Sequence, residues 1–158
     1  MSSMRNGSNG FLVDTNVLVY AYDLRDRNKH ERATLALGAV IGARRAVLSV
    51  QCLSEFFNVT TRRLPEPLTR EQALTRIERL SYVCRVLDLT PAVVLEGCSG
   101  TVRHGLSIWD ALIWAAAKMN QVPYVLTEDA PHERFLEGVR FLNPFVPDFD
   151  LRILDLGS

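Results

Sequence analysis

Several features that would place the chain in a broad class are missing from its sequence. No apolar run approaches the ~20 residues that cross a bilayer as a helix, so we expect no membrane-spanning segment. Residues 1–10 lack the apolar stretch of a secretory signal, and we expect them to form a disordered lead. The 18 basic and 18 acidic residues cancel, so the strong positive charge of many nucleic-acid-binding proteins is absent. A local basic surface would still suffice for RNA.

Cysteine and lysine are also scarce. The three cysteines form no Cys-x-x-Cys pair and have no histidine at the spacing of a zinc site. Each lies among apolar neighbours, so we expect Cys52, Cys84 and Cys98 to be buried, reduced thiols in a cytoplasmic protein. Because Lys29 and Lys118 are the only lysines, arginine supplies most of the positive charge. Arginine suits phosphate recognition, although a biased genomic base composition would explain the same excess.

The remaining pattern is that of one α/β domain. With 158 residues, 47% of them hydrophobic, the chain can bury a single core. Short β-like runs are expected at residues 11–13, 46–48, 82–87, 124–127 and 139–142. Helical patterns are expected at residues 15–22, 29–41, 50–62, from 70, 91–104 and 108–120. This alternation predicts a parallel sheet with helices on both faces, in a domain spanning residues 11–146.

The C-terminal tail, residues 147–158, alternates apolar and charged residues over part of its length. Such a segment is compatible with a short edge strand, with packing on the core, or with a contact to a partner. The sequence does not choose among these.

Acidic residues stand after two of the predicted strands and inside one apolar helix. Asp14 and Asp129 each follow a strand, where a helix cap or a turn is the ordinary role of aspartate. Asp110 lies in a helix that is apolar nearly all round, so its carboxylate is expected to be partly buried. A buried carboxylate costs several kcal/mol unless it is paired or bound to metal. Ser107 offers the alternative of a capping box for Asp110.

Glu55 shares a polar helical stripe with Gln51, Asn58 and Arg62, which is typical of a solvated face. The position of the four acids nevertheless suggests a common site, because ligands of parallel sheets bind beyond the carboxyl ends of the strands. Two carboxylates ~5 Å apart repel by about 3 kcal/mol at an effective dielectric near 20. Four together need protonation or a cation, and oxygen ligands favour Mg²⁺ or Mn²⁺. Such an ion readies water for attack on a phosphoryl group.

Four segments carry a resemblance to a known family: FLVDTNVLVYAYD, SVQCLSEFFNV, LSIWDALIWAAA and YVLTEDAPHERFLEGVRFLNPF. In this order they resemble motifs of the PIN-domain nucleases, and within them the VapC toxins of type II toxin–antitoxin modules. They span residues 11–145, nearly the whole predicted domain. The resemblance implies a three-layer α/β/α sandwich with a central parallel sheet, and a Mg²⁺- or Mn²⁺-dependent endoribonuclease.

The resemblance also assigns roles to individual residues. The catalytic and metal-binding acids of the family fall on Asp14, Glu55, Asp110 and Asp129. Asn16 and Thr127 match its supporting polar positions. An RNA substrate, a small VapB-like antitoxin that occupies the site, and a homodimer are implied as well. The chain departs from the family at residues 130–134, where APHER replaces a Gln-His-Gly-like turn, and this affects the expected loop shape and substrate choice.

Other functions fit parts of the sequence. A haloacid-dehalogenase-type phosphatase needs a second aspartate where Asn16 stands, and a response-regulator receiver needs an acidic pair at the first strand. A non-catalytic PIN-like module that binds RNA or protein would be expected to lose some of the acids. A solitary RNA-processing nuclease would keep them but have no antitoxin gene beside it.

Histidine and tryptophan offer further candidates. We expect His30, His104 and His132 to have surface or capping roles, with a general base as the alternative for His132. Trp109 and Trp114 could stack on bases. Because their helix is so apolar, packing in the core is the preferred interpretation for both.

Overall fold

The computed structural model describes residues 9–155. Residues 1–8 of the predicted disordered lead, and residues 156–158 of the tail, lie outside the described part. Along the chain the elements are β1 (Phe11–Val13), α1 (Thr15–Tyr20), α2 (Arg27–Gly42), β2 (Ala46–Ser49), α3 (Val50–Arg62), α4 (Arg70–Val83), β3 (Arg85–Leu87), α5 (Pro91–His104), α6 (Ile108–Met119), β4 (Tyr124–Leu126), β5 (Phe135–Leu136), β6 (Val139–Leu142) and the 3₁₀ helix η2 (Leu151–Leu154).

The strands form one sheet in the order β3-β2-β1-β4-β6-β5. The first five strands of this order are parallel, as predicted, whereas β5 runs antiparallel to β6. The sequence pattern did not predict β5, which has only two residues. Glu137 and Gly138 join β5 to β6 with φ angles of 47° and 89°, as a tight hairpin of primed type requires.

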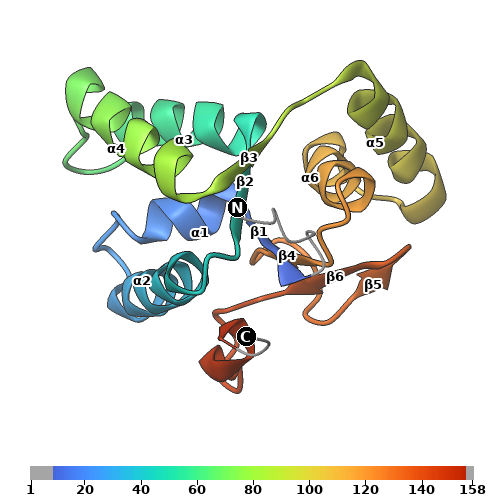
Figure 1. Ribbon diagram of the computed structural model, residues 1–158. Coiled ribbons are helices and arrows are strands. Elements are labelled where there is room, and N and C mark those ends of the chain that lie inside the picture. The colour runs from blue at the N-terminus through green and yellow to red at the C-terminus, as the bar shows by residue number, and fades with distance from the viewer. Residues whose placement is uncertain (1–8, 156–158) are drawn as a thin grey trace, which may run out of the picture.

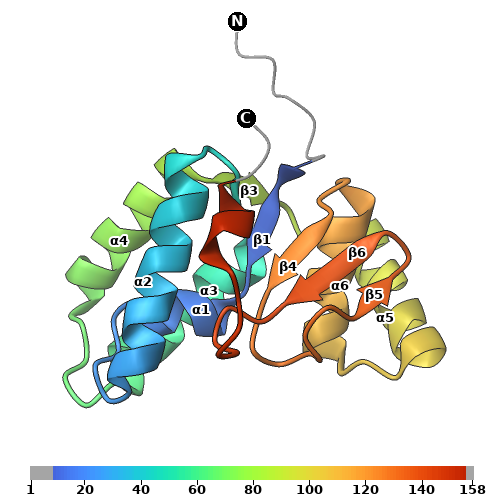
Figure 2. The same cartoon turned by 90° about the horizontal axis from the view of Figure 1, so that it is seen from below.

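Helices cover both faces of the sheet, so the predicted α/β/α sandwich is confirmed. In Figure 1, α5 and α6 lie on one side of the sheet, over β4 and β6, while α1, α2, α3 and the C-terminal helical turn lie on the other side. Figure 2 shows α2 and η2 in front of the strands from the other side. The strands β1 and β2 are buried along their whole length, which places the core on both faces of the central strands. Within the described residues, every helix is too short or too polar to cross a bilayer.

Side-chain caps begin most of the helices at the predicted positions. The hydroxyls of Ser49, Thr90 and Ser107 each accept a hydrogen bond from an amide in the first turn. Thr69 and Gln72 form the predicted capping box of α4. Since such a cap satisfies amides that have no partner inside the helix, short local patterns located these starts well.

Element ends were predicted less well. α1 ends at Tyr20 instead of residue 22, and residues 82 and 83 belong to α4 instead of a strand. The helical bonding of α4 continues up to the amide of Cys84, which donates to the carbonyl of Leu80. Tyr82 is 92% exposed on this last turn. An apolar run at the end of an amphipathic helix was therefore mistaken for the start of a strand.

Cys98 is exposed, so the prediction that all three cysteines are buried is wrong for this residue. Cys52 and Cys84 are buried as predicted. The inner face of α5 is formed by Gly97 and Gly100, which turns Cys98 outward. Apolar neighbours in sequence did not identify the buried face, because they lie around the whole circumference of this helix.

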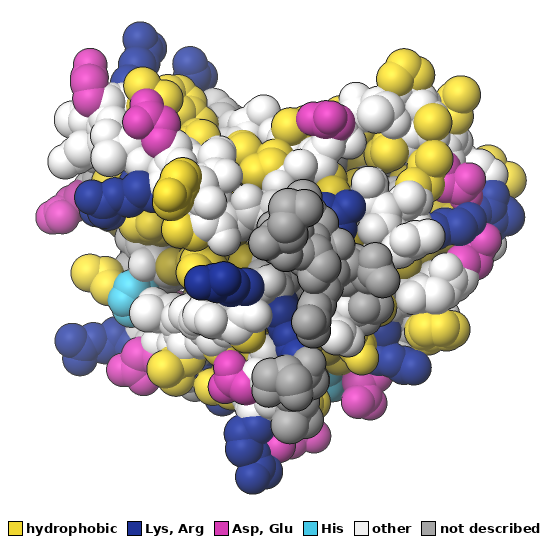
Figure 3. Space-filling view, in the orientation of Figure 1, with side chains coloured by type: hydrophobic (Ala, Val, Ile, Leu, Met, Phe, Trp, Pro, Cys, Tyr) yellow, Lys and Arg dark blue, Asp and Glu magenta, His cyan; other side chains and the backbone are white. Residues whose placement is uncertain are grey.

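The C-terminal segment packs on the core as a 3₁₀ helix and forms no edge strand within its described residues. Phe149 and Leu154 are buried, and η2 contacts α2. From α2, the Arg32 guanidinium donates to the carbonyls of Pro144, Val146 and Phe149. Figure 3 shows a face hollowed at the top between the α3–α4 and α5–α6 sides, with basic and acidic side chains interspersed around it.

Candidate metal centre

The register of the sheet brings Asp14 and Thr127 together. Val13 of β1 pairs with Leu126 of β4, so Asp14 and Thr127 are the next residues beyond the carboxyl ends of two adjacent parallel strands. The Asp14 amide donates to the Leu126 carbonyl over 2.9 Å. The Thr127 hydroxyl donates to Asp14 Oδ2 over 2.8 Å. The pairing of β1 with β4 thus places these two residues, which are far apart in sequence, side by side.

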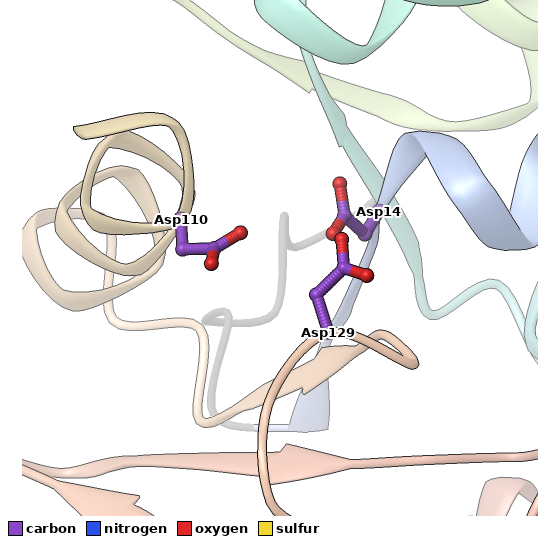
Figure 4. A group of neighbouring side chains, drawn as sticks. All are labelled: Asp14, Asp110 and Asp129. Atoms are coloured by element: carbon purple, nitrogen blue, oxygen red, sulfur yellow. The ribbon is translucent and has the colours of Figure 1, made fainter. Parts of the chain in front are cut away.

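Three carboxylates meet at this edge of the sheet. Asp14 comes from the start of α1, Asp110 from the first turn of α6, and Asp129 from the loop after β4. Each offers an oxygen within 4.8 Å of an oxygen of the other two. Figure 4 shows the three side chains pointing toward one another from these separate elements. The predicted convergence of these three acids is found in the structure.

Asn16 and Thr127 connect the carboxylates. The Asn16 amide nitrogen lies 3.0 Å from Asp129 Oδ2, 3.2 Å from Thr127 Oγ1 and 3.4 Å from Asp14 Oδ2. The Thr127 hydroxyl also accepts the Asp129 amide over 3.1 Å. The two polar residues thus hold two of the three acids at fixed positions.

Without a bound cation, burial destabilises the ionised carboxylates of Asp14 and Asp110. Removal from water raises the pKa of Asp14 to about 7, with smaller contributions from the charges of Asp129 and Asp110, against the hydrogen bonds from Thr127 and Thr15. Removal from water also raises the pKa of Asp110, and the charges of Asp129 and Glu55 add to it. A cation would remove these penalties, because it stabilises the ionised carboxylates.

The cluster fits a hard divalent cation. All its ligand atoms are carboxylate oxygens, which suit Mg²⁺ and Mn²⁺. Among the described residues, Asn16 Oδ1 is a buried oxygen without a hydrogen-bond partner. It is a free acceptor for a water molecule held by such a cation.

Comparison with known families decides the identity of this fold. The model of the PIN domain matches residues 11–135, most of the chain. The chain belongs to the PIN-domain family. No curated protein sequence matches this PIN domain.

Solved structures with the same fold include toxin–antitoxin complexes and a toxin. A structure of FitAB bound to a DNA fragment is 21% identical with a TM-score of 0.65, and the match covers 88% of this chain and 98% of the other. A toxin–antitoxin complex from Klebsiella pneumoniae is 16% identical with a TM-score of 0.62, covering 85% and 98%. The sarcin–ricin-loop-cleaving toxin VapC20 of Mycobacterium tuberculosis is 21% identical with a TM-score of 0.55, covering 73% and 87%. At these identities the likeness establishes the PIN fold.

Glu55 lies beside the three-carboxylate cluster of the PIN domain and is not a member of it. Its Oε2 accepts the Thr15 hydroxyl over 2.9 Å, and its Oε1 accepts the Gln51 amide over 3.0 Å. Its charge nevertheless raises the pKa of Asp110. The polar stripe on α3, which suggested a solvated face, therefore lies at the margin of the site, where Gln51 holds Glu55 by a hydrogen bond.

The three histidines have contacts elsewhere in the PIN domain. His30 Nδ1 donates to the Tyr20 carbonyl, His104 contacts Glu137, and His132 Nδ1 accepts the Asn143 amide. His132 also packs edge-on against Phe149. These contacts are compatible with the predicted surface or capping roles, and the bond from Asn143 anchors His132 in the loop after Asp129.

The two tryptophans of α6 differ, so the prediction that both are in the core is wrong for Trp109. Trp114 is fully buried, whereas Trp109 is 64% exposed. Trp109 is in the first turn of α6, directly before Asp110. The apolar composition of the helix reflects the seven buried residues from Ala111 to Ala117 and says little about this first turn.

Proposed function

We propose that this PIN domain is a Mg²⁺- or Mn²⁺-dependent endoribonuclease that hydrolyses RNA phosphodiester bonds. The observation that carries the proposal is the meeting of three aspartate carboxylates within 4.8 Å at the carboxyl edge of the sheet. The raised pKa values of Asp14 and Asp110 show that these two ionised carboxylates are destabilised by burial, and a bound cation would relieve this cost. Support also comes from VapC20, a relative in fold that is a sarcin–ricin-loop-cleaving toxin.

In this proposal the three aspartates Asp14, Asp110 and Asp129 are the catalytic metal ligands. A Mg²⁺ or Mn²⁺ ion held by these carboxylates would supply polarisation of the phosphoryl group and a bound water of lowered pKa. Asn16 and Thr127 keep the carboxylates of Asp129 and Asp14 in place by their hydrogen bonds. Supporting contacts of this kind determine how well ligands bind a metal.

Glu55 is the fourth catalytic acid of the proposal. Because Thr15 and Gln51 each donate to one of its carboxylate oxygens, the side chain is held in one orientation at the margin of the cluster. From there it serves to orient the attacking water or to add a ligand to a cation. It is the least direct of the four acids, since it lies outside the group of three.

We further propose that the chain is the toxin of a VapBC-type module. Structures of toxin–antitoxin complexes, among them VapBC from Salmonella typhimurium, share its fold. The expected partners are an RNA substrate, a small VapB-like antitoxin that occupies the site, and a second copy of the chain. We assign the activity to residues 11–146 and expect the protein in the cytoplasm. A small antitoxin reading frame beside the gene distinguishes a toxin from a solitary processing nuclease.

The proposal is tested by incubating the purified chain with total RNA in Mg²⁺, Mn²⁺ or EDTA. We expect cleavage with either metal and none with EDTA. The D14N and D110N variants should lose at least about 100-fold in rate, because several kcal/mol of charge stabilisation are removed. Asp148→Asn changes an exposed acid of the C-terminal segment and should cleave like the unaltered chain. If D110N cleaves RNA as fast as the unaltered chain, the reaction does not occur at this site. If no chain cleaves RNA, a non-catalytic module is favoured.

A further inference from the structure

Trp109 is an exposed aromatic residue whose position the proposed chemistry does not explain. It is 64% exposed at the start of α6, a helix whose following seven residues are all buried. Leaving an indole in water forgoes the stabilisation that burial gives to a large apolar side chain. The ring is therefore available for an external contact without unpacking the core.

The backbone of Trp109 is tied to the margin of the candidate metal centre. The Gln51 amide donates to the Trp109 carbonyl over 3.3 Å and to Glu55 Oε1 over 3.0 Å. Ser107 fixes the same turn of α6 by accepting the Asp110 amide. Because adjacent Cα atoms are about 3.8 Å apart, the Trp109 backbone directly adjoins that of a proposed metal ligand. A phosphate at the cluster would have its flanking nucleotides near this turn.

The polar groups at the first turn of α6 favour a nucleobase over an apolar peptide face as the partner of Trp109. Ser107, Gln51, Asp110 and Glu55 are polar groups around this turn, whereas an amphipathic helix of a partner protein seeks an apolar groove. A nucleobase needs only one flat aromatic surface, and stacking of this kind tolerates any base. Single-stranded RNA exposes such bases, unlike a paired helix.

We propose that Trp109 is the stacking platform for an unpaired base next to the scissile phosphate. This inference rests on the proposed ribonuclease function. It assigns to Trp109 a role in binding the substrate and leaves the chemistry to the four acids.

The test compares Trp109→Ala and Trp109→Phe in the full chain on a short single-stranded RNA with Mg²⁺. Base–aromatic stacking of about 1–3 kcal/mol corresponds to a rise in KM of about 5- to 150-fold for the alanine variant, with little change in kcat. The phenylalanine variant should keep most of the affinity. Tyr82→Ala is the matched control, because Tyr82 is 92% exposed and precedes β3, at the opposite, amino edge of the sheet.

A second substrate separates stacking from a merely structural effect. After the cleavage site has been mapped, an abasic nucleotide is placed on either side of it. One of the two should raise KM for the unaltered chain and add nothing for Trp109→Ala, since the two changes remove the same contact. An equal abasic penalty in both chains would overturn the inference. An unchanged KM for Trp109→Ala would also overturn the inference, even if this substitution weakens binding of the antitoxin. If the unaltered chain cleaves no RNA, the proposed function fails first and this inference fails with it.

Discussion

At the scale of single residues, Asp14 combines a structural and a chemical position. Its Oδ1 accepts the Thr15 amide over 2.7 Å, as the cap of α1. Its Oδ2 accepts the Thr127 hydroxyl and faces the other acids. The cap and the metal ligand, which the sequence left as alternatives, are therefore compatible. A turn that ends a buried strand holds its carboxylate rigidly, and this rigidity favours a site that must bind an ion.

The pKa of Asp14 predicts a specific pH dependence for the metal-free protein. Burial raises this pKa from 3.8 to about 7, so between these values the folded state binds a proton that the unfolded state does not. Stability is then greatest at low pH within this window and is lost as pH rises toward 7. In EDTA, urea unfolding should show the free energy of the unaltered chain falling by about 2–3 kcal/mol, relative to D14N, from pH 5 to pH 7. Parallel curves for the two chains would show that Asp14 is not buried in this way.

At the scale of secondary-structure elements, local patterns predicted helix starts and missed the rotation of helices about their axes. Ser49 and Ser107 cap where a hydroxyl precedes a helical period. Cys98 and Trp109 were assigned to the core because apolar residues surround them in sequence. Which side of each helix faces the interior is set by tertiary packing. The strand β5 was missed because two residues carry no period.

Two helical glycines, one of them at the α5–α6 interface, are predicted to respond in opposite ways to replacement by alanine. A Cβ at Gly100 would lie 2.5 Å from the ring of Trp114, which cannot retreat because its Nε1 donates to the Leu136 carbonyl. Overpacking of about 1–3 kcal/mol should exceed the gain of about 1 kcal/mol in helix propensity, so Gly100→Ala is expected to destabilise the fold. Gly38, in α2, has nothing within 4 Å of its added Cβ, and Gly38→Ala should stabilise by about 0.5–1 kcal/mol. Urea unfolding measures both, and a Gly100→Ala chain as stable as the unaltered one would refute the tight packing.

At the scale of the whole molecule, the sheet topology explains how distant acids form one site. The parallel order β2-β1-β4 directs the ends of β1 and β4 to one edge, where Asp14 and Asp129 lie. This convergence could be predicted, because the alternation of strands and helices implies parallel strands and a common carboxyl edge. Which acids touch could not be predicted. Glu55 lies apart from the three aspartates, since its distance depends on the tilt of α3 and on its contacts with Thr15 and Gln51.

The most direct test of the central claim measures the binding of Mn²⁺ to the full chain. Binding is monitored through the decrease of the free-ion signal in electron paramagnetic resonance. If the three aspartates form a cation site, the unaltered chain and the D148N control should bind Mn²⁺ with the same affinity. Asp110→Asn should weaken binding by at least about tenfold, because it removes a carboxylate from a set of three. Equal Mn²⁺ affinity in Asp110→Asn and the unaltered chain would contradict the claim that these carboxylates hold a metal ion.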